Sequence, residues 1–396
     1  MTHPRRILII RLSHLGDVVQ ALPLYHALAA AYPGAELAWA VQDEFSDLIN
    51  GLPGLERVIT FNRKGSLRAW ATLREDLAAF SPDWTVDAQG NSKSALVALA
   101  SGARRRTGLA REHWREGFAA GTCTDLAPTP QAGAALHGLE RVLALARHCV
   151  GTGAAPLRRD PALTPTELAA GRRVLTEHVS ATGHHSAPTL LHLSRSGDPR
   201  SWPAEHFASL AQLLGPGSPV LSLAGPAEGA EAAIAEAAGV PVLRQNGQRA
   251  LAALFAAAAQ AGGRLVACDS APAHLAAAVD LPVTLLAGPQ DEHLTGPWPA
   301  DNAISPSTQA GALAHSPHSP HSPPGPPATP ATASAHRTLR RPDLHCAPCR
   351  ARICAAQEGP RCMLDLLPAT VAAALEGPSS PSTHSSSDQP ACEPAG

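Results

Sequence analysis

The chain has 396 residues, of which 44% are hydrophobic and 16% charged, so it is long enough for about two or three domains with substantial cores. The net charge of −2 gives no support for nucleic-acid binding through a global basic field. No run of about 18 apolar residues predicts a transmembrane helix, and Arg11, His14 and Asp17 interrupt the first apolar stretch too early for a secretory signal. We therefore expect a cytoplasmic protein that binds no nucleic acid.

The first part of the chain alternates short apolar runs with longer amphipathic stretches. The pattern predicts strands at 7–12, 36–41, 57–61 and 84–87, and helices at 18–31, 67–80, 92–100 and 136–149. Pro23 is expected to kink or redefine the first turns of the first helix. Because such βα units form parallel sheets covered on both faces, we predict an α/β, Rossmann-like domain over residues 1–155.

A second series of the same kind follows an inter-domain connection at 156–187, which carries a helical piece near 167–179. Its predicted strands are 189–193, 220–224, 264–268 and 282–287, and its predicted helices are 204–214, 228–238, 251–261 and 272–279. We assign 188–301 and 342–376 to a second Rossmann-like domain.

Two segments have a composition that cannot bury enough apolar surface to fold. Residues 302–341 are rich in Pro, Ser, Ala and His, with a His-Ser-Pro triplet repeated three times from His315 to Pro323. We predict a disordered insertion there, with metal binding by the repeat histidines as the alternative, and a disordered tail at 377–396.

The loop between the first strand and the first helix is the first candidate site. It reads Arg-Leu-Ser-His-Leu-Gly-Asp from Arg11 to Asp17, in a position where loops of an open α/β sheet line the ligand crevice. Gly16 permits close backbone approach, and the Asp17 carboxylate could act as a general base on a sugar hydroxyl. The alternative is that Asp17 only caps the helix. The loop lacks the GxGxxG pattern of nicotinamide-dinucleotide sites.

Three loops of the second series favour an anionic ligand. Segment 194–203 carries Arg195 and Arg200 before a helix, and guanidinium groups bind phosphate bidentately; the alternative is a pair of solvated loop charges. Segment 268–274 runs from a strand into a helix, where Ser270 can cap and the backbone N–H groups beside His274 suit a pyrophosphate. The alternative there is plain capping and a packed histidine. Segment 288–298 follows the next strand and lies on the same rim.

Four cysteines lie late in the chain, at Cys346, Cys349, Cys354 and Cys362. Four thiolates could hold a structural zinc ion, although the second half of the motif lacks a CxxC pair. Disulfides, an iron–sulfur site and reduced structural cysteines are the alternatives.

In combination, these motifs resemble a known family. The stretch RILIIRLSHLGDVVQALPL, which begins at Arg6, resembles the N-terminal motif of the ADP-heptose:lipopolysaccharide heptosyltransferases, glycosyltransferase family 9. The stretch DSAPAHLAAA from Asp269, the later Gly288-Pro and Thr295-Gly-Pro, and the cysteine-containing segment that ends in Arg361-Cys-Met-Leu-Asp-Leu are similar to the same family. The similarity covers 6–375 apart from the insertion.

The resemblance implies a GT-B fold, in which two Rossmann-like domains face each other across a cleft. It implies an inverting, metal-independent transfer of a sugar from ADP-heptose or another nucleoside-diphosphate sugar, with no cofactor required. The acceptor would be a lipopolysaccharide core, another glycolipid or another cell-surface acceptor, with the enzyme at the cytoplasmic face of the inner membrane as a peripheral protein.

The resemblance also implies roles for particular residues. Asp17 would be the general base, on an acceptor-side loop with Ser13, His14 and Gly16. Donor and phosphate binding would fall to a second set, namely Arg195, Arg200, Glu228, Asp269, Ser270, Ala271 and His274. Two of these depart from the family pattern, because Ala271 replaces a glycine and Arg200 replaces a lysine of different reach. A nucleotide-sugar epimerase on a similar fold and a non-catalytic, nucleotide-sugar-binding relative are the alternatives.

Overall fold

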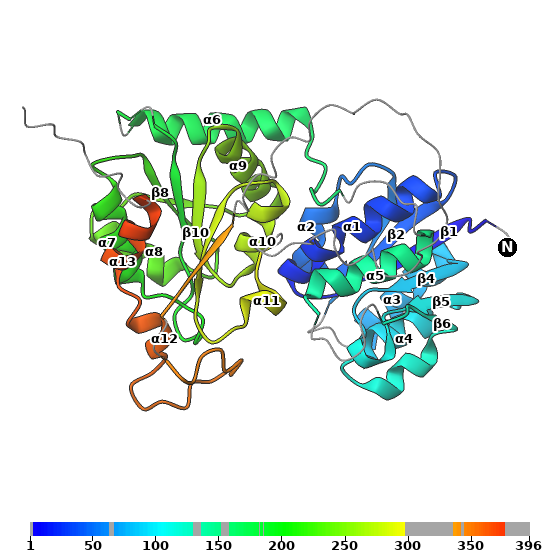
Figure 1. The fold of residues 1–396 in the computed structure, drawn as a ribbon. Helices are drawn as coiled ribbons and strands as arrows, with labels where there is room; N and C mark the ends of the chain where they lie inside the picture. Colours follow the sequence, from blue (N-terminus) through cyan, green and yellow to red (C-terminus); the bar gives the residue numbers. More distant parts are fainter. Residues whose placement is uncertain are drawn as a thin grey trace, which may run out of the picture.

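The computed structural model describes residues 3–62, 67–129, 136–151, 158–181, 183–184, 186–297, 336–341 and 344–376. In this part of the chain two parallel six-stranded sheets, each flanked by helices, form two lobes side by side (Figure 1). The predicted α/β architecture of two Rossmann-like units is confirmed. Residues 302–335 of the predicted insertion and the predicted tail at 377–396 lie outside the described residues.

The N-terminal lobe contains the first sheet and its helices. Its strands are β1 (Arg6–Ile10), β2 (Glu36–Gln42), β3 (Leu55–Phe61), β4 (Trp84–Asp87), β5 (Arg105–Gly108) and β6 (Asp125–Leu126). Its helices are α1 (Leu15–Ala31), α2 (Ser46–Ile49), α3 (Leu67–Phe80), α4 (Ser92–Ala100) and α5 (Gly138–Val150), with short 3-10 turns η1 (Asp43–Phe45), η2 (Arg111–His113) and η3 (Gly117–Thr122).

The C-terminal lobe repeats this plan. Its strands are β7 (Thr189–His192), β8 (Val220–Ala224), β9 (Val242–Arg244), β10 (Arg264–Cys268), β11 (Val283–Ala287) and β12 (Arg337–Arg340). Its helices are α6 (Pro165–Ala181), α7 (Ala204–Leu214), α8 (Gly229–Ala237), α9 (Gln248–Gln260), α10 (Ala271–Ala278), α11 (Glu292–Thr295), α12 (Arg361–Leu364) and α13 (Pro368–Glu376).

Both sheets have the same strand order. The first runs β3-β2-β1-β4-β5-β6 and the second β9-β8-β7-β10-β11-β12. In each, the order reverses between the first and fourth strands, and ligands of open α/β sheets bind beyond the carboxyl ends of the strands at that switch point. The loops after β1 and β4, and those after β7 and β10, are therefore the places to look for a site.

The apolar run of β1 shows why these strands lie in the interior. Ile7 and Ile9 pack into one hydrophobic cluster while Leu8 and Ile10 pack into another, and all four are fully buried. Because successive side chains of a strand point to opposite faces, a continuous apolar run is what a strand covered on both faces requires.

Several predicted boundaries are wrong. Helix α1 begins at Leu15, three residues before the predicted start, and continues through Pro23. The short strands β5, β6 and β9 have too few residues for a clear pattern and were not predicted. Strand β12 lies inside the predicted insertion and pairs in parallel with β11. The predicted end of the disordered insertion at residue 341 is therefore too late in the chain. Pairing with a distant strand, rather than local composition, orders that short segment.

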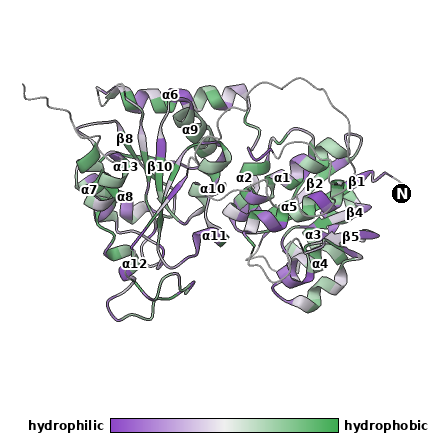
Figure 2. Cartoon of the chain, viewed as in Figure 1, coloured by the Kyte–Doolittle hydropathy of each residue, from purple (hydrophilic) through white to green (hydrophobic). Residues whose placement is uncertain are grey.

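Helix α6 lies in the predicted connection, yet it packs along α9 of the second lobe (Figure 1). A Cβ atom on Gly171 of α6 would lie only 2.3 Å from the Ala253 carbonyl oxygen, so only glycine permits this close crossing. Figure 2 shows that hydrophobic residues dominate α9 and α10.

The buried guanidinium of Arg249, on α9, ties the lobes and the connection together. It pairs with the Glu167 carboxylate at 2.5 and 2.8 Å and donates to the carbonyl oxygens of Leu48 and Pro161 at 3.1 and 3.0 Å and of Ala162 at 3.2 Å. Within the described ranges, no helix is both long enough and apolar enough to cross a bilayer.

Candidate active site

Asp17 lies in the first turn of α1, directly after the loop that follows β1. The N-cap position is His14, so the alternative that Asp17 merely caps the helix is wrong. The Asp17 Oδ1 atom forms an ion pair with Arg11 Nη2 at 2.8 Å, while the Asp17 side chain remains 39% exposed. The carboxylate is thus held in one orientation and still reachable by a substrate.

A second guanidinium, that of Arg141 on α5, lies near the same carboxylate. Burial and the positive charge of Arg11 lower the pKa of Arg141, whereas the charge of Asp17 raises it. Arg141 is anchored by its Nε and Nη2 donors to the Leu136 carbonyl at 3.2 and 3.0 Å. Two cations therefore accompany Asp17. The sequence analysis missed Arg141, because only the fold brings α5 beside the β1–α1 loop.

The loop after β4 supports the β1–α1 loop from the neighbouring strand. Gln89 Oε1 accepts from the Leu12 N–H at 2.6 Å, and Gln89 Nε2 donates to Ser13 Oγ at 3.4 Å. Buried Asp87 orders this loop by accepting from the N–H groups of Gln89 and Gly90 at 2.8 and 3.0 Å. Burial raises the pKa of Asp87, and these hydrogen bonds oppose the rise. The predicted loop residue His14 is exposed.

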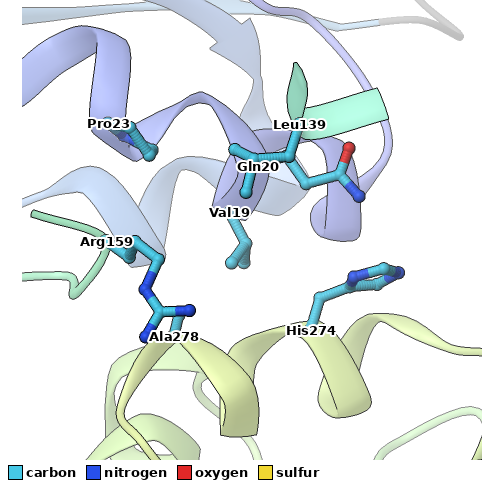
Figure 3. Close-up of a pocket in the computed structure, with 7 residues that line it drawn as sticks. All are labelled: Val19, Gln20, Pro23, Leu139, Arg159, His274 and Ala278. Carbon is cyan, nitrogen blue, oxygen red and sulfur yellow. The ribbon is translucent and has the colours of Figure 1, made fainter. Parts of the chain in front are cut away.

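The two lobes meet at Gly16 and His274. A Cβ atom on Gly16 would lie 2.8 Å from Cδ2 of the His274 ring on α10, whose side chain is 11% exposed. Figure 3 shows His274 extending from α10 beneath Val19 and Gln20 of α1. In this structure the close approach that Gly16 permits is to His274 of the other domain.

On the donor side, Ser270 occupies the N-cap position of α10 without capping it. Its hydroxyl donates to the Cys268 carbonyl at 3.1 Å, and no side-chain cap hydrogen bond is formed. The expected capping by Ser270 is therefore wrong. Pro272 has no N–H and the Ala273 N–H donates to the Ser270 carbonyl at 3.1 Å, so the Ala271 N–H is the group left for another acceptor. An anion at a helix N-terminus is stabilised by such a group.

Asp269 precedes this helix and lies largely buried. Its Oδ2 accepts from the Thr295 hydroxyl at 3.2 Å, and its Oδ1 lies 3.8 Å from His274 Nε2. Burial raises the pKa of Asp269 and lowers the pKa of His274, with the Asp269 charge opposing the latter shift. The Asp269–His274 pair therefore connects the donor loop to the domain contact at Gly16.

The predicted phosphate ligand Arg200 is paired within its own loop. Its Nε and Nη2 atoms donate to the two Asp198 carboxylate oxygens at 2.9 and 2.6 Å. The pKa of Arg200 is raised, first by the Asp198 hydrogen bonds and further by the charge of Asp269. Arg200 thus stands within electrostatic reach of the α10 N-terminus.

The other predicted donor residues, Arg195 and Glu228, lie in the loops after β7 and β8. Arg195 is exposed and lowers the pKa of Glu228, which burial raises. Glu228 Oε2 accepts from the Gly225 N–H at 3.0 Å. The sequence analysis missed Glu231, a buried residue whose Oε1 accepts from the Ser196 N–H at 2.7 Å and so holds the Arg195 loop.

A second contact between the lobes was also missed. His137 Nδ1 accepts from the Leu139 N–H at 3.1 Å, which leaves Nε2 as the donor to the Gly296 carbonyl at 2.9 Å. Burial lowers the pKa of His137 to about 4, so the ring is neutral near pH 7. Gly296 directly follows Thr295, the partner of Asp269. The only sequence signal was a capping pattern at the start of α5.

The family model described as glycosyltransferase family 9 (heptosyltransferase) matches residues 70–318, which is more than half of the chain. The chain belongs to this family. Lipopolysaccharide heptosyltransferase 1 of Pseudomonas aeruginosa is 29% identical over 305 residues, covering 74% of this chain and 81% of that relative.

Two solved structures extend the comparison. The Escherichia coli heptosyltransferase WaaC with ADP is 25% identical, with a TM-score of 0.58, covering 74% of this chain and 90% of that one. The E. coli ADP-heptose lps heptosyltransferase II is 20% identical, with a TM-score of 0.64, covering 94% and 97%. The fold is that of the GT-B heptosyltransferases, and the protein is a glycosyltransferase. Both expectations from the motifs are thus confirmed.

A recess between the lobes adjoins this constellation through His274. It has an open volume of about 280 Å³ and is lined by Val19, Gln20, Pro23, Leu139, Arg159, His274 and Ala278 (Figure 3). The lining is mainly apolar and includes neither Asp17 nor Arg200, so the recess belongs to the domain interface.

The late cysteines do not form the metal cluster considered from the sequence. Cys346 and Cys349 are exposed, Cys354 is half-buried, and Cys362 is buried beneath the β11 end. Among the described residues, which include all four, no three His, Cys, Asp or Glu side chains are placed to hold a metal ion. The structural-zinc alternative therefore lacks a coordination sphere in the described structure. The four cysteines still lie near one another, because burial and then the charges of Cys346, Cys349 and Cys354 raise the pKa of Cys362.

Proposed function

We propose that this glycosyltransferase transfers heptose from ADP-heptose to an acidic glycolipid of the lipopolysaccharide-core type, with inversion at the anomeric carbon. The observation that carries the proposal is the close approach of Gly16 to His274. It brings the β1–α1 loop, which carries Asp17, next to the β10–α10 loop, where no side chain caps the start of α10.

Asp17 is the proposed general base. Its carboxylate would accept the proton of the acceptor hydroxyl as that oxygen attacks the anomeric carbon. The bond from the anomeric carbon to the diphosphate oxygen breaks, and ADP departs with the electron pair. Arg11 would serve as a positioning residue, because it fixes the rotamer of Asp17 while leaving the side chain 39% exposed.

The donor rim would stabilise the charge that develops on the diphosphate. We assign this role to the backbone N–H groups of Ser270 and Ala271 at the start of α10, together with Arg200 and Arg195, and propose that these groups act without a metal ion. Arg200 would exchange part of its pairing with Asp198 for the diphosphate. Glu228 would lie near the donor nucleotide. The Asp269–His274 pair would fix the position of the α10 N-terminus relative to the acceptor domain.

The acceptor would be held on the first domain. Arg11 and Arg141 make the surroundings of Asp17 cationic, which suits an acceptor that carries negative charge. The loop containing Ser13, His14 and Gly16 would contact the acceptor sugar. We place the enzyme at the cytoplasmic face of the inner membrane, with residues 1–155 as the acceptor domain and 188–301 with 342–376 as the nucleotide-sugar domain.

The deciding experiment supplies purified protein with ADP-heptose in the presence and absence of a deacylated core acceptor. Acceptor-dependent ADP release, with a matching mass increase of the acceptor and inverted anomeric configuration by NMR, supports the proposal. Parallel incubations with UDP- and GDP-sugars test the donor. A change of the sugar without acceptor would favour the epimerase alternative, and absence of any nucleotide-sugar binding by calorimetry would favour a non-catalytic relative.

A further inference from the structure

One face of the N-terminal domain exposes large apolar side chains among cations. On α4, the residues Lys93, Leu96 and Leu99 are exposed at a spacing of three, while Ser94, Ala95, Val97 and Ala98 are buried. Leu96 is 53% and Leu99 49% exposed, and Phe118 of the adjacent η3 turn is 80% exposed. Single exposed apolar residues are ordinary, whereas a group of them marks an interaction surface.

The two elements are joined, so these residues form one surface. The Ser92 N–H and hydroxyl at the start of α4 donate to Glu116 Oε2 at 2.9 and 3.1 Å. Arg111 Nη1 donates to the Gly117 carbonyl at 3.0 Å, which brings this cation next to Phe118. We name Lys93, Leu96, Leu99, Arg111, Arg115 and Phe118 the α4–η3 patch. Helix α4 lies at the lower edge of the N-terminal lobe in Figure 1.

The charge of this region is opposite to that of the whole chain. Residues 92–118 contain six Lys or Arg residues and two Glu residues, a net charge of +4, whereas the chain carries −2. Arg105 stacks over the Trp84 ring at 3.8 Å and Arg106 donates to backbone carbonyls, so these two serve the fold. Lys93, Arg111 and Arg115 are exposed, and Arg115 Nε lies 3.5 Å from Glu116 Oε1.

The α4–η3 patch also adjoins the acceptor side of the site. The Arg115 N–H donates to the Gly90 carbonyl at 2.8 Å, and Gln89 in the same loop contacts Ser13. A surface bound at the patch therefore lies along the rim that carries Asp17.

We infer that the α4–η3 patch docks the N-terminal domain on an anionic phospholipid bilayer, and so presents Asp17 to an acceptor whose lipid is anchored there. This inference rests on the proposed glycolipid acceptor. Apolar side chains that enter the headgroup region, ringed by Lys and Arg, are the combination that binds anionic bilayers. Protein interfaces, in contrast, are depleted of lysine at their cores, which makes a bilayer the better fit than a protein partner.

The test measures co-sedimentation of the full chain with phosphatidylcholine vesicles and with vesicles that also contain phosphatidylglycerol. An apolar variant, Leu96→Gln with Leu99→Gln and Phe118→Ser, should lose roughly tenfold or more in partitioning. A charge variant, Lys93→Gln with Arg111→Gln and Arg115→Gln, should lose about fivefold per charge on anionic vesicles, and binding by the wild type should weaken with added salt.

Matched controls lie on the other lobe. Leu213→Gln removes a leucine of α7 that is 52% exposed, and Arg173→Gln removes an α6 cation whose side chain is 74% exposed. Both should leave vesicle binding unchanged, and thermal melting should show that every variant is folded. Wild type that ignores anionic vesicles, or α4–η3 variants that bind them like wild type, would overturn the inference. If the wild type formed a dimer and the α4–η3 variants did not, with no change in vesicle binding, the patch would be a protein interface. That result would also overturn the inference.

Transfer to the water-soluble, deacylated acceptor separates this inference from the proposed function. The α4–η3 variants should transfer sugar to that acceptor at the wild-type rate. Their rate of transfer to an acceptor embedded in vesicles should fall in proportion to their loss of vesicle binding. Vesicle binding at the patch in a protein that transfers no sugar would contradict the proposed function and leave the docking surface standing.

Discussion

The two switch points share one topology and differ in their chemistry. After β1 and β4, the carboxylate of Asp17 is partly exposed and paired with Arg11. After β7 and β10, the carboxylate of Asp269 is largely buried beside a neutral histidine, and a helix N-terminus remains uncapped. The same strand order thus supports two different sites: one after β1 and β4 with a carboxylate that can accept a proton, and one after β7 and β10 that can bind an anion. Topology determines where a site lies, and the side chains determine what it can do.

The largest effect should come from the acceptor rim. Asp17→Asn keeps the shape but removes the base, so kcat should fall about 10²–10⁴-fold while the donor Kd stays near that of the wild type. The measurement combines steady-state transfer rates with calorimetric donor titration. Glu75→Gln, an exposed change on α3, is the matched control. Transfer at the wild-type rate by Asp17→Asn would remove Asp17 from the mechanism.

A smaller effect is expected on the donor rim. Arg200→Gln removes a charge-assisted contact to the diphosphate, so the donor Kd should rise about tenfold to a hundredfold. Arg200→Lys should recover part of the lost donor affinity, because lysine keeps the positive charge but cannot bind the diphosphate bidentately. Arg173→Gln controls for loss of a surface charge. Equal ADP affinity in wild type and Arg200→Gln would mean that Arg200 only orders its loop through Asp198.

The contact between the rims can be tested at Gly16. In Gly16→Ala the new methyl group would lie 2.8 Å from the His274 ring, so the ring or the domains must shift. We expect about a tenfold loss in kcat, because a small displacement of reacting groups is costly, with donor affinity little changed. Gly34→Ala, where a Cβ meets nothing within 4 Å, is the control. An unchanged kcat would show that the catalytic geometry does not depend on this contact.

The smallest effect should come from the second inter-domain contact. His137→Gln removes or weakens the hydrogen bond to Gly296, at a cost of about 1 kcal/mol in unfolding free energy.

Its pH dependence has a defined sign. The folded-state pKa of His137 is lowered by burial to about 4 from 6.5, so between these values the unfolded chain binds a proton that the folded chain does not. Stability should therefore fall as pH drops from 6.5 to 4, and less steeply in His137→Gln. His192, with its pKa also lowered to about 4, preserves part of the slope in the variant. Urea denaturation across this range measures both effects, and identical slopes would contradict the burial of a neutral His137.

Much of the candidate site could be predicted from local sequence. Asp17, Ser270 and His274 each follow a predicted strand and open a helix, and the carboxyl ends of parallel strands carry ligand sites. Arg141 and His137 could not be found in this way, since they lie on α5 and reach the site only when that helix packs beside α1. The late cysteines show the opposite case: the fold brings Cys346, Cys349 and Cys354 near Cys362, but among the described residues no three ligand side chains are placed to hold a metal ion.

The sequence by itself determined the alternation of strands and helices, because apolar periodicity and turn residues are local properties of the chain. It also determined the chemical character of each loop. Only the tertiary structure decided which loops meet, that Ser270 leaves its helix uncapped, and that Arg200 rests on Asp198. It alone decided that β12 joins β11 beyond a long intervening segment. The meeting of the loops and the β11–β12 pairing depend on partners far apart in sequence. The bonds of Ser270 to Cys268 and of Arg200 to Asp198 are local, but the surrounding fold selects them from several partners that the sequence allows.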